Sequence, residues 1–221
     1  RQHGAAENIL NSTRATDFIT PKSRISHLFR DVTLELAERY PFARSLVNSG
    51  RLSMPCHYDA SPLNGHDVEA MPTELRPGSP AKDAPVHLAD KPAWLLNQLG
   101  DRFVLLLDGR IDATHAEALA AELGELLNRQ ADLGLVVIGP AAEALSRLPR
   151  TTVVADSEHL ATQRYGLTGG SAYLVRPDQH ITARWNAVTA ADVDTALARA
   201  LGESLATITD TISQGGRHIT A

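Results

Sequence analysis

Two neighbouring residues, Cys56 and His57, form the pair in this sequence with the most reactive chemistry. An imidazolium next to a thiol favours the nucleophilic thiolate, so such a pair is a candidate for thiol chemistry. Cys56 is the only cysteine of the 221 residues, which excludes an internal disulfide and a cysteine-rich metal site. The favoured interpretation is nevertheless a chance pair in a proline-rich linker.

Histidine is common in the chain, with nine copies, and invites a metal hypothesis. Zinc sites use closely spaced His or Cys ligands, for example two histidines four residues apart on one helix face. No such pair lies on a predicted helix, and six of the histidines are scattered: His57, His66, His87, His115, His159 and His180. We therefore expect surface or structural histidines and no metal site.

Glycine and serine motifs that bind phosphate or activate a nucleophile are also missing. Flavin binding in a Rossmann unit needs G-x-G-x-x-G between a strand and a helix, whereas Gly169-Gly170 lack the third glycine and precede a strand. The chain has no P-loop and no G-x-S-x-G elbow, and Asn48-Ser49-Gly50 lie in a turn context. The sequence thus assigns no catalytic, cofactor-binding or metal-ligating residue.

The elements that would position a site begin with a strand, a helix and a second strand. Residues 103–107 and 135–138 are short apolar runs typical of strands buried on both faces. Between them, Thr114 and Glu117 form a predicted capping box for a helix with Leu at helical spacing. A redox thioredoxin carries C-x-x-C at the turn before this helix, but here the turn reads Asp108-Gly109-Arg110-Ile111-Asp112, which excludes thiol chemistry at this turn.

A β-hairpin is predicted over 173–185, with Pro177 at the second position of its turn and Asp178 closing that turn. Before it we expect a short helix over 141–147, an edge strand over 152–155, and a helix capped by Ser157 that ends near Gly166. Thr189 should cap a last helix that ends before Gly202. The order βαβ, connector, ββα over residues 93–204 is thioredoxin-like, and 205–221 is expected to be a weakly ordered tail.

A helical segment and a proline-rich linker precede this α/β domain. Thr20-Pro21 predict the start of a helix that ends near Tyr40, before Pro41. One face of this helix carries an apolar stripe of Ile25, Leu28, Phe29, Val32 and Leu36. Burying this stripe would stabilise the protein by on the order of 10 kcal/mol. Residues 1–60 supply few other apolar residues to cover it, which points to an absent upstream domain or a second subunit. Residues 54–92 contain seven prolines and are predicted to hold no long element, although Tyr58, Leu63 and Leu75 can pin them to a surface.

Charge and composition argue against several classes of partner. Residues 1–55 carry eight Lys or Arg and five acids, which is a net charge of +3. Because the whole chain has a net charge of −5, the remaining residues carry −8. An acidic body argues against nucleic acid as a partner. No apolar stretch approaches the roughly 20 residues of a membrane span and no signal peptide is evident, so we expect no membrane partner and a cytoplasmic location.

Several of these segments together resemble one enzyme family. The C-terminal stretch RYGL, GG, AYLVRPD and I-x-A-R-W is similar to the end of the thioredoxin-like domain of FAD-dependent aromatic-ring hydroxylases, the relatives of phenol hydroxylase and of 3-(3-hydroxyphenyl)propionate and polyketide hydroxylases. Nearer the N-terminus, the same order and spacing recur in Glu7-Asn8, Ser12-Thr13, Thr16-Asp17-Phe18, Pro21, Phe42-Ala43-Arg44 and Arg51-Leu52-Ser53. The opening at Arg1 without Met likewise suggests the middle of a longer reading frame.

The resemblance implies the C-terminal region of a flavoprotein monooxygenase that uses FAD, NAD(P)H and O2 on a phenolic ring. Residues 1–53 would then end the flavin domain, and the thioredoxin-like domain would support that missing domain and a homodimer. The family's flavin-contacting motifs map to no position here, so this chain alone should bind no cofactor and be inactive. The alternative is a stand-alone, non-redox thioredoxin-like interaction module. A peroxiredoxin-like or glutathione-binding protein is weaker, because Thr168-Gly169-Gly170 supply neither a cysteine nor a cis-proline before the hairpin.

Overall fold

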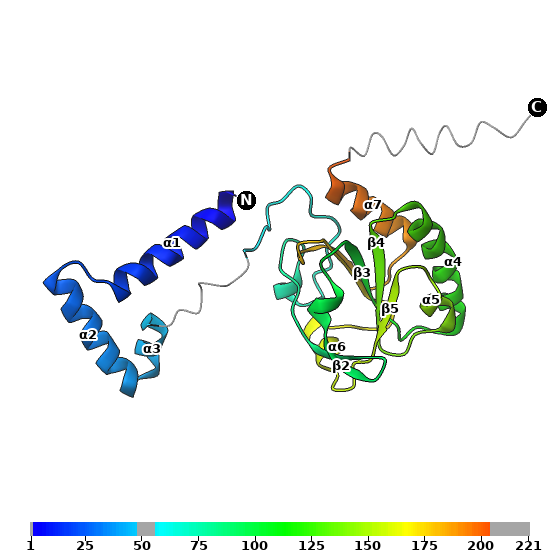
Figure 1. Cartoon of the computed structure of the whole chain (residues 1–221). Helices are drawn as coiled ribbons and strands as arrows, with labels where there is room; N and C mark the ends of the chain where they lie inside the picture. Colours follow the sequence, from blue (N-terminus) through cyan, green and yellow to red (C-terminus); the bar gives the residue numbers. More distant parts are fainter. Residues whose placement is uncertain (1, 48–55, 204–221) are drawn as a thin grey trace, which may run out of the picture. The chain divides into compact units, whose positions relative to one another are not determined.

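The computed structural model of the chain describes residues 2–47 and 56–203 and divides it into two compact units, Arg1–Cys56 and His57–Ala221 (Figure 1). The predicted tail over 205–221 and the segment Asn48-Ser49-Gly50 lie outside the described residues. Each unit is described by itself below. No helix among residues 2–47 and 56–203 is long and apolar enough to cross a bilayer.

The N-terminal unit consists of three helices, α1 (Gln2–Ile19), α2 (Arg24–Arg39) and α3 (Pro41–Val47). The predicted start at Thr20-Pro21 is wrong, because the Thr20 hydroxyl donates to the Thr16 carbonyl at the end of α1, 2.7 Å away. Ser23 caps α2 instead, and its hydroxyl accepts from the Ser26 amide. The predicted end near Tyr40 is confirmed, since Tyr40 is the C-cap.

The apolar stripe on α2 faces outward from its own unit. Ile25 is 81% exposed and Phe29 is 60% exposed, with Leu28, Val32 and Leu36 also exposed. Within the unit the stripe has one aromatic neighbour, since the Phe18 and Phe29 rings meet edge to face with their centroids 6.5 Å apart. The helices of this unit therefore leave the stripe uncovered.

The second unit is built on a five-stranded sheet in the order β5-β4-β3-β6-β7. The β3, β4 and β5 strands are parallel, whereas β6 and β7 run antiparallel to their neighbours. The strands are β3 (Phe103–Asp108), β4 (Leu133–Ile138), β5 (Thr151–Val154), β6 (Ala172–Val175) and β7 (Ile181–Trp185). The helices between and after them are α4 (Ala113–Arg129), α5 (Glu143–Ser146), α6 (Leu160–Tyr165) and α7 (Ala190–Leu201). This is the predicted βαβ, connector, ββα order, and the fold is thioredoxin-like.

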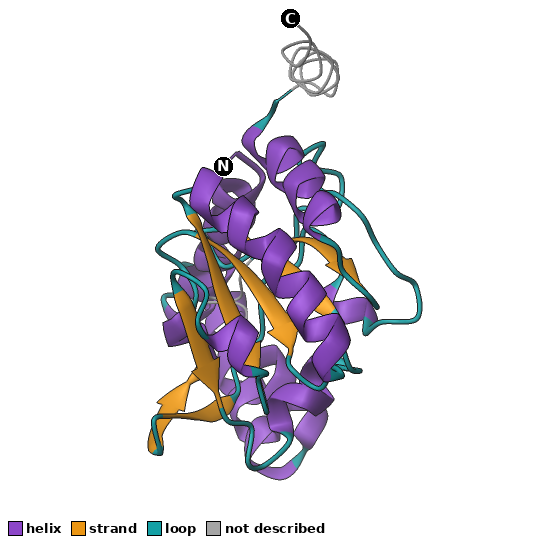
Figure 2. Ribbon diagram, turned by 90° about the vertical axis from the view of Figure 1, so that its right-hand side faces the viewer, coloured by secondary structure: helices purple, strands orange, loops and turns teal. Residues whose placement is uncertain are grey.

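Alternation along the central strands creates two cores, one on each face of the sheet. Leu105 and Leu107 face a core that α4 and α7 cover, whereas Val104 and Leu106 face a core that α6 and the linker cover. Figure 2 shows the long helices lying across one face of the sheet. The two-sided burial of β3 and β4, which are buried along their whole length, confirms the prediction from their apolar runs.

The proline-rich stretch from residue 57 onward belongs to the second unit and packs on its sheet. It contains a short antiparallel pair, β1 (Pro85–Leu88) and β2 (Lys91–Trp94), and two 3-10 turns, η2 (Thr73–Leu75) and η3 (Leu95–Gln98). The predicted anchors hold: Leu75 is fully buried, Tyr58 packs on the His180 ring, and the Leu63 carbonyl accepts from Thr182. Backbone hydrogen bonds from Gly65 and Gly78 to β7 carbonyls tie the stretch to that edge strand.

Two predicted helix caps differ from the observed ones. The α4 helix begins at Ala113, and Asp112 rather than Thr114 accepts from the His115 amide. Ser157 does not cap α6; the Asp156 carboxylate accepts from the Ala161 and Thr162 amides instead. In both cases an aspartate upstream of the predicted Ser or Thr takes the role, and its negative charge is also favourable at the positive end of the helix dipole.

The other predicted turns and caps are confirmed. Gln179 N–H donates to the Arg176 carbonyl across the hairpin turn, and the Asp178 carboxylate accepts from Arg176 and from the His180 amide. Gly166 ends α6 with φ at +57°. Thr189 and Asp192 form a reciprocal capping box at the start of α7, which ends at Gly202.

Candidate functional site

The loop that follows β3 occupies the position at which a redox thioredoxin carries its cysteines, and here it holds an ion pair. The Asp108 side chain is 1% exposed, and its two oxygens accept from the Arg110 guanidinium at 2.9 and 2.6 Å. One of these oxygens also accepts from the Arg110 backbone amide at 3.0 Å. The carboxylate and the guanidinium therefore fix the shape of the loop.

A second loop packs against the first and restricts it further. Arg110 donates to the Leu167 carbonyl at 3.0 Å, which joins the loop after β3 to the loop before β6. A β-carbon on Gly169 would lie 2.2 Å from the Arg110 carbonyl oxygen, so only glycine allows this approach. Gly170 has φ at +82°, the left-handed region that favours glycine. The Gly169-Gly170 pair thus serves backbone packing.

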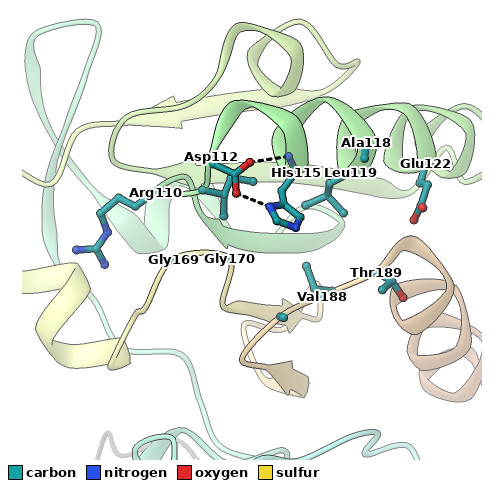
Figure 3. A pocket seen from close by; sticks show the side chains of 12 residues that line it. Arg110, Asp112, His115, Ala118, Leu119, Glu122, Gly169, Gly170, Val188 and Thr189 are labelled. Carbon is teal, nitrogen blue, oxygen red and sulfur yellow. Dashed lines mark hydrogen bonds and ion pairs between the residues drawn. The ribbon is translucent and has the colours of Figure 1, made fainter.

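Beside these loops lies a groove with a volume of about 460 Å³. One wall is the first half of α4, the other is the turn before α7, and the Gly169-Gly170 loop closes one end (Figure 3). The side chain of Arg110 points away from the other labelled groups in Figure 3, toward its carboxylate partner. The groove is lined by Arg110, Ile111, Asp112, His115, Ala118, Leu119, Glu122, Gly169, Gly170, Ala187, Val188 and Thr189.

The polar groups of the groove are mainly acceptors. The Asp112 carboxylate caps α4 and also bonds to the His115 ring, a contact drawn as a dashed line in Figure 3. That hydrogen bond and the one from the His115 backbone amide lower the pKa of Asp112, so this carboxylate stays charged at neutral pH. The hydrogen bond to Asp108 raises the pKa of Arg110, which keeps the guanidinium charged and paired.

This groove does not suit a flavin. A dinucleotide needs N–H groups at a helix N-terminus for its pyrophosphate, and at α4 that position is filled by the Asp112 carboxylate. Glu122 adds a second negative charge along the same wall. The nearest cation, Arg110, is already neutralised by Asp108. Like charges would therefore repel FAD from this groove.

The six histidines singled out in the sequence lie apart, each with its own neighbours. His57 contacts the Ser79 hydroxyl at 3.2 Å, His66 stacks on Trp185, and His180 packs on Tyr58. His87 lies near the Ser157 hydroxyl, His115 bonds to Asp112, and His159 precedes α6 in a left-handed conformation. In the part of the chain that the structure describes, no three His, Cys, Asp or Glu residues are grouped so that they could hold a metal.

Cys56 is buried, with 8% of its surface exposed, and is the last residue of the first unit in the sequence. The reactivity considered for the pair Cys56-His57 stays a prediction. The structure reveals two buried charges that no sequence motif selects, Asp108 and Arg184, and an exposed partner of the first, Arg110. The spacing of an acid two residues before an arginine, at the end of an apolar run, is the signal that could have identified Asp108 and Arg110.

Comparison of the sequence finds no match among protein-family models and none among curated proteins. Comparison of the structure does find proteins of similar fold. The flavin-dependent monooxygenase PieE, solved with FAD and substrate, matches with a TM-score of 0.54 and 17% identity over 85% of this chain and 32% of its own. Aklavinone-11 hydroxylase, solved with FAD and aklavinone, matches with a TM-score of 0.47 and 20% identity over 79% of this chain and 34% of its own. Peroxidoxin BcpB from Mycobacterium tuberculosis matches with a TM-score of 0.45 and 15% identity over 58% of this chain and 97% of its own.

The match to PieE extends beyond the thioredoxin-like domain. The unit His57–Ala221 makes up about three quarters of the chain, so a match over 85% of the chain reaches into the N-terminal unit. The chain spans about a third of the length of each of the two monooxygenases. Structurally, then, this chain resembles one part of a flavin-dependent monooxygenase and has a thioredoxin-like domain as its larger unit.

Proposed function

We propose that this chain is the C-terminal structural and dimerisation part of an FAD-dependent monooxygenase that hydroxylates a phenolic ring with NAD(P)H and O2. In this proposal the flavin domain lies upstream of Arg1, and residues 2–47 continue it. The chain alone binds neither FAD nor NAD(P)H and is inactive. A homodimer is the second proposed association, and a cytoplasmic location stays a prediction.

The observation that carries the proposal is the extent of the likeness to PieE, which includes part of the helical unit as well as the thioredoxin-like domain. A likeness confined to the second unit would support an isolated domain equally well. The exposed stripe on α2 adds to this, because Ile25, Leu28 and Phe29 need a cover that the three helices of their unit do not supply. A preceding flavin domain would provide that cover.

The site after β3 supports a packing role. Its Asp108–Arg110 pair holds a fixed loop where redox relatives keep a thiol, and the groove beside it repels the phosphates of a flavin or nicotinamide cofactor. In this proposal the domain packs against the other domains of the enzyme, and the catalytic site lies on the flavin domain.

The test compares this chain with the product of its complete reading frame. We expect the complete product to purify with bound FAD and to oxidise NAD(P)H in the presence of O2 and a panel of simple phenols, whereas the 221-residue chain does neither. A complete product with no flavin and no such oxidation would contradict the proposal.

A second candidate is a stand-alone interaction module, favoured by the same exposed stripe on α2. In that case a separate protein covers the stripe and the reading frame encodes no flavin domain. The two candidates therefore differ in whether the cover of α2 is part of the same polypeptide.

A further inference from the structure

The groove beside α4 combines apolar walls with negative charge. Ile111 and Leu119 are partly exposed on one side, and Val188 lies opposite them (Figure 3). Asp112 stands at one end of the α4 wall and Glu122 at the other. An apolar surface between two carboxylates suits a ligand that carries apolar and cationic groups together.

The two basic side chains that line the groove, Arg110 and His115, are already engaged by other groups. Arg110, which lines the groove, bonds through its guanidinium to the Asp108 carboxylate and the Leu167 carbonyl. Across the groove, the opposite wall consists of the uncharged residues Ala187, Val188 and Thr189. His115 is the other basic side chain of the lining, and its ring bonds to Asp112.

The length of the groove indicates the kind of ligand. Asp112 and Glu122 are ten residues apart, which along a helix corresponds to about 15 Å. An extended peptide covers that distance with about four or five residues at roughly 3.3 Å each. Successive side chains of such a segment point to opposite sides, so alternate residues meet the groove.

We propose that this groove is a docking site for an extended segment of another protein, one in which lysine or arginine lies near aliphatic residues. The aliphatic side chains contact Ile111, Leu119 and Val188, and the cations lie at the Asp112 and Glu122 ends. This inference concerns the second unit alone and does not depend on the proposed monooxygenase.

The probe is a fluorescein-labelled heptapeptide of sequence Gly-Arg-Ser-Leu-Ser-Arg-Gly, in which the leucine and both arginines lie on one side of the extended chain and the arginines are about 13 Å apart. The control peptide has glutamate in place of both arginines. Fluorescence anisotropy with the full chain should give a dissociation constant at or below about 1 mM for the arginine peptide at low salt, and weaker binding by at least about tenfold for the glutamate peptide. In NMR spectra of ¹⁵N-labelled protein, the backbone amide signals whose chemical shifts change on addition of the arginine peptide should belong to residues 110–122, 169–170 and 187–189. Equal binding of both peptides, no binding, or shift changes elsewhere would each overturn the proposal.

Two matched pairs of substitutions on the exposed surface of α4 localise the contact. Ala118→Arg places a bulky cation on the groove wall and should weaken binding at least about tenfold, whereas Ala121→Arg, on the same helix but outside the groove, should leave it unchanged. Glu122→Lys should weaken binding about three- to tenfold, with Glu117→Lys as its control. Equal effects within either pair would contradict the assignment. Self-association of the chain that the Ala118→Arg variant abolishes would show that a second copy, not another protein, is the occupant.

Discussion

Arg184 is the most deeply buried cation among the described residues, and it fastens the proline-rich stretch to β7. Its side chain is 2% exposed, with Asp67 as its ion-pair partner and the Pro72 carbonyl accepting at 2.6 Å. Asp67 itself is about half exposed, so solvent screens part of the attraction. The guanidinium therefore stabilises mainly by filling buried volume and satisfying the Pro72 carbonyl.

Replacing Arg184 with alanine should lower the free energy of unfolding by about 2–3 kcal/mol, because it leaves a cavity and removes one of the two hydrogen bonds that the Pro72 carbonyl accepts, the other coming from the Leu75 amide. Arg102→Ala is the control, since Arg102 pairs with Asp101 at the surface and its loss should cost less than about 1 kcal/mol. The free energy of unfolding of each variant is measured by urea denaturation, with tryptophan fluorescence as the signal. Equal destabilisation by the two substitutions would argue against the anchoring role of Arg184.

Two tyrosines make stability depend on pH in the alkaline range. Burial raises the pKa of Tyr173 to about 12 and also raises the pKa of Tyr165. Between pH 10 and 12 the unfolded chain therefore loses a proton that folded Tyr173 keeps, so stability falls as pH rises. The slope should be about 1.4 kcal/mol per pH unit for each tyrosine.

Tyr173→Phe should make that slope shallower by about 1.4 kcal/mol per pH unit, even though the loss of the hydrogen bond to the Tyr165 carbonyl lowers stability at neutral pH. Urea unfolding at several pH values above 10 gives both quantities. An unchanged slope would mean that Tyr173 is accessible to solvent and ionises in the folded protein.

At the scale of elements, the sequence predicted the buried strands, the hairpin and the last helix, because each depends on local periodicity and turn residues. The apolar runs of β3 and β4, Pro177 and Thr189 all act over a few neighbouring positions. Helix starts were harder, since several polar residues competed for each cap. The sequence predicts caps at Thr20, Thr114 and Ser157, whereas Ser23, Asp112 and Asp156 accept the amides.

The linker and the groove were beyond the reach of local patterns. Residues 57–84 lack periodicity, and their packing depends on partners more than a hundred residues away, such as the Leu63 carbonyl with Thr182. The groove joins residues 110–122 with 169–170 and 187–189, which meet only when the sheet has formed. The absence of cysteine from the loop after β3, in contrast, is visible in the sequence itself.

The cap of α6 provides a direct test at this scale. Asp156→Ala should destabilise the protein by about 1–2 kcal/mol, because the Ala161 and Thr162 amides lose their acceptor. Ser157→Ala should change stability by less than about 0.5 kcal/mol, since Ser157 is an exposed residue. Thermal unfolding of the two variants beside the wild type distinguishes them. A larger loss of stability in Ser157→Ala than in Asp156→Ala would indicate that Ser157 caps α6, as the sequence predicts.

At the scale of the molecule, the two units differ in how they bury apolar surface. The second unit has a core on each face of its sheet, whereas exposed large apolar side chains gather in the described part of the first unit. They are Ile9, Leu10, Ile19, Ile25, Leu28, Phe29, Val32, Leu34, Leu36, Tyr40 and Phe42. Such a surface is typical of a segment that is completed by a partner.

The isolated chain should therefore self-associate through this surface. We expect light scattering after gel filtration to give a mass above the 23.8 kDa of one chain, and expect the double variant Ile25→Asp, Phe29→Asp to shift it toward that value. A wild-type monomer in which hydrogen exchange shows α2 to be strongly protected would mean that the chain covers the stripe by itself.

The most direct test of the central claim is the sequence of the reading frame upstream of Arg1. The account predicts a continuous frame that encodes a strand followed by G-x-G-x-x-G and a helix, the fold of a dinucleotide-binding domain. A start codon immediately before Arg1, or an upstream domain without that fingerprint, would contradict the monooxygenase assignment. The chain would then be an interaction module whose partner is a separate protein.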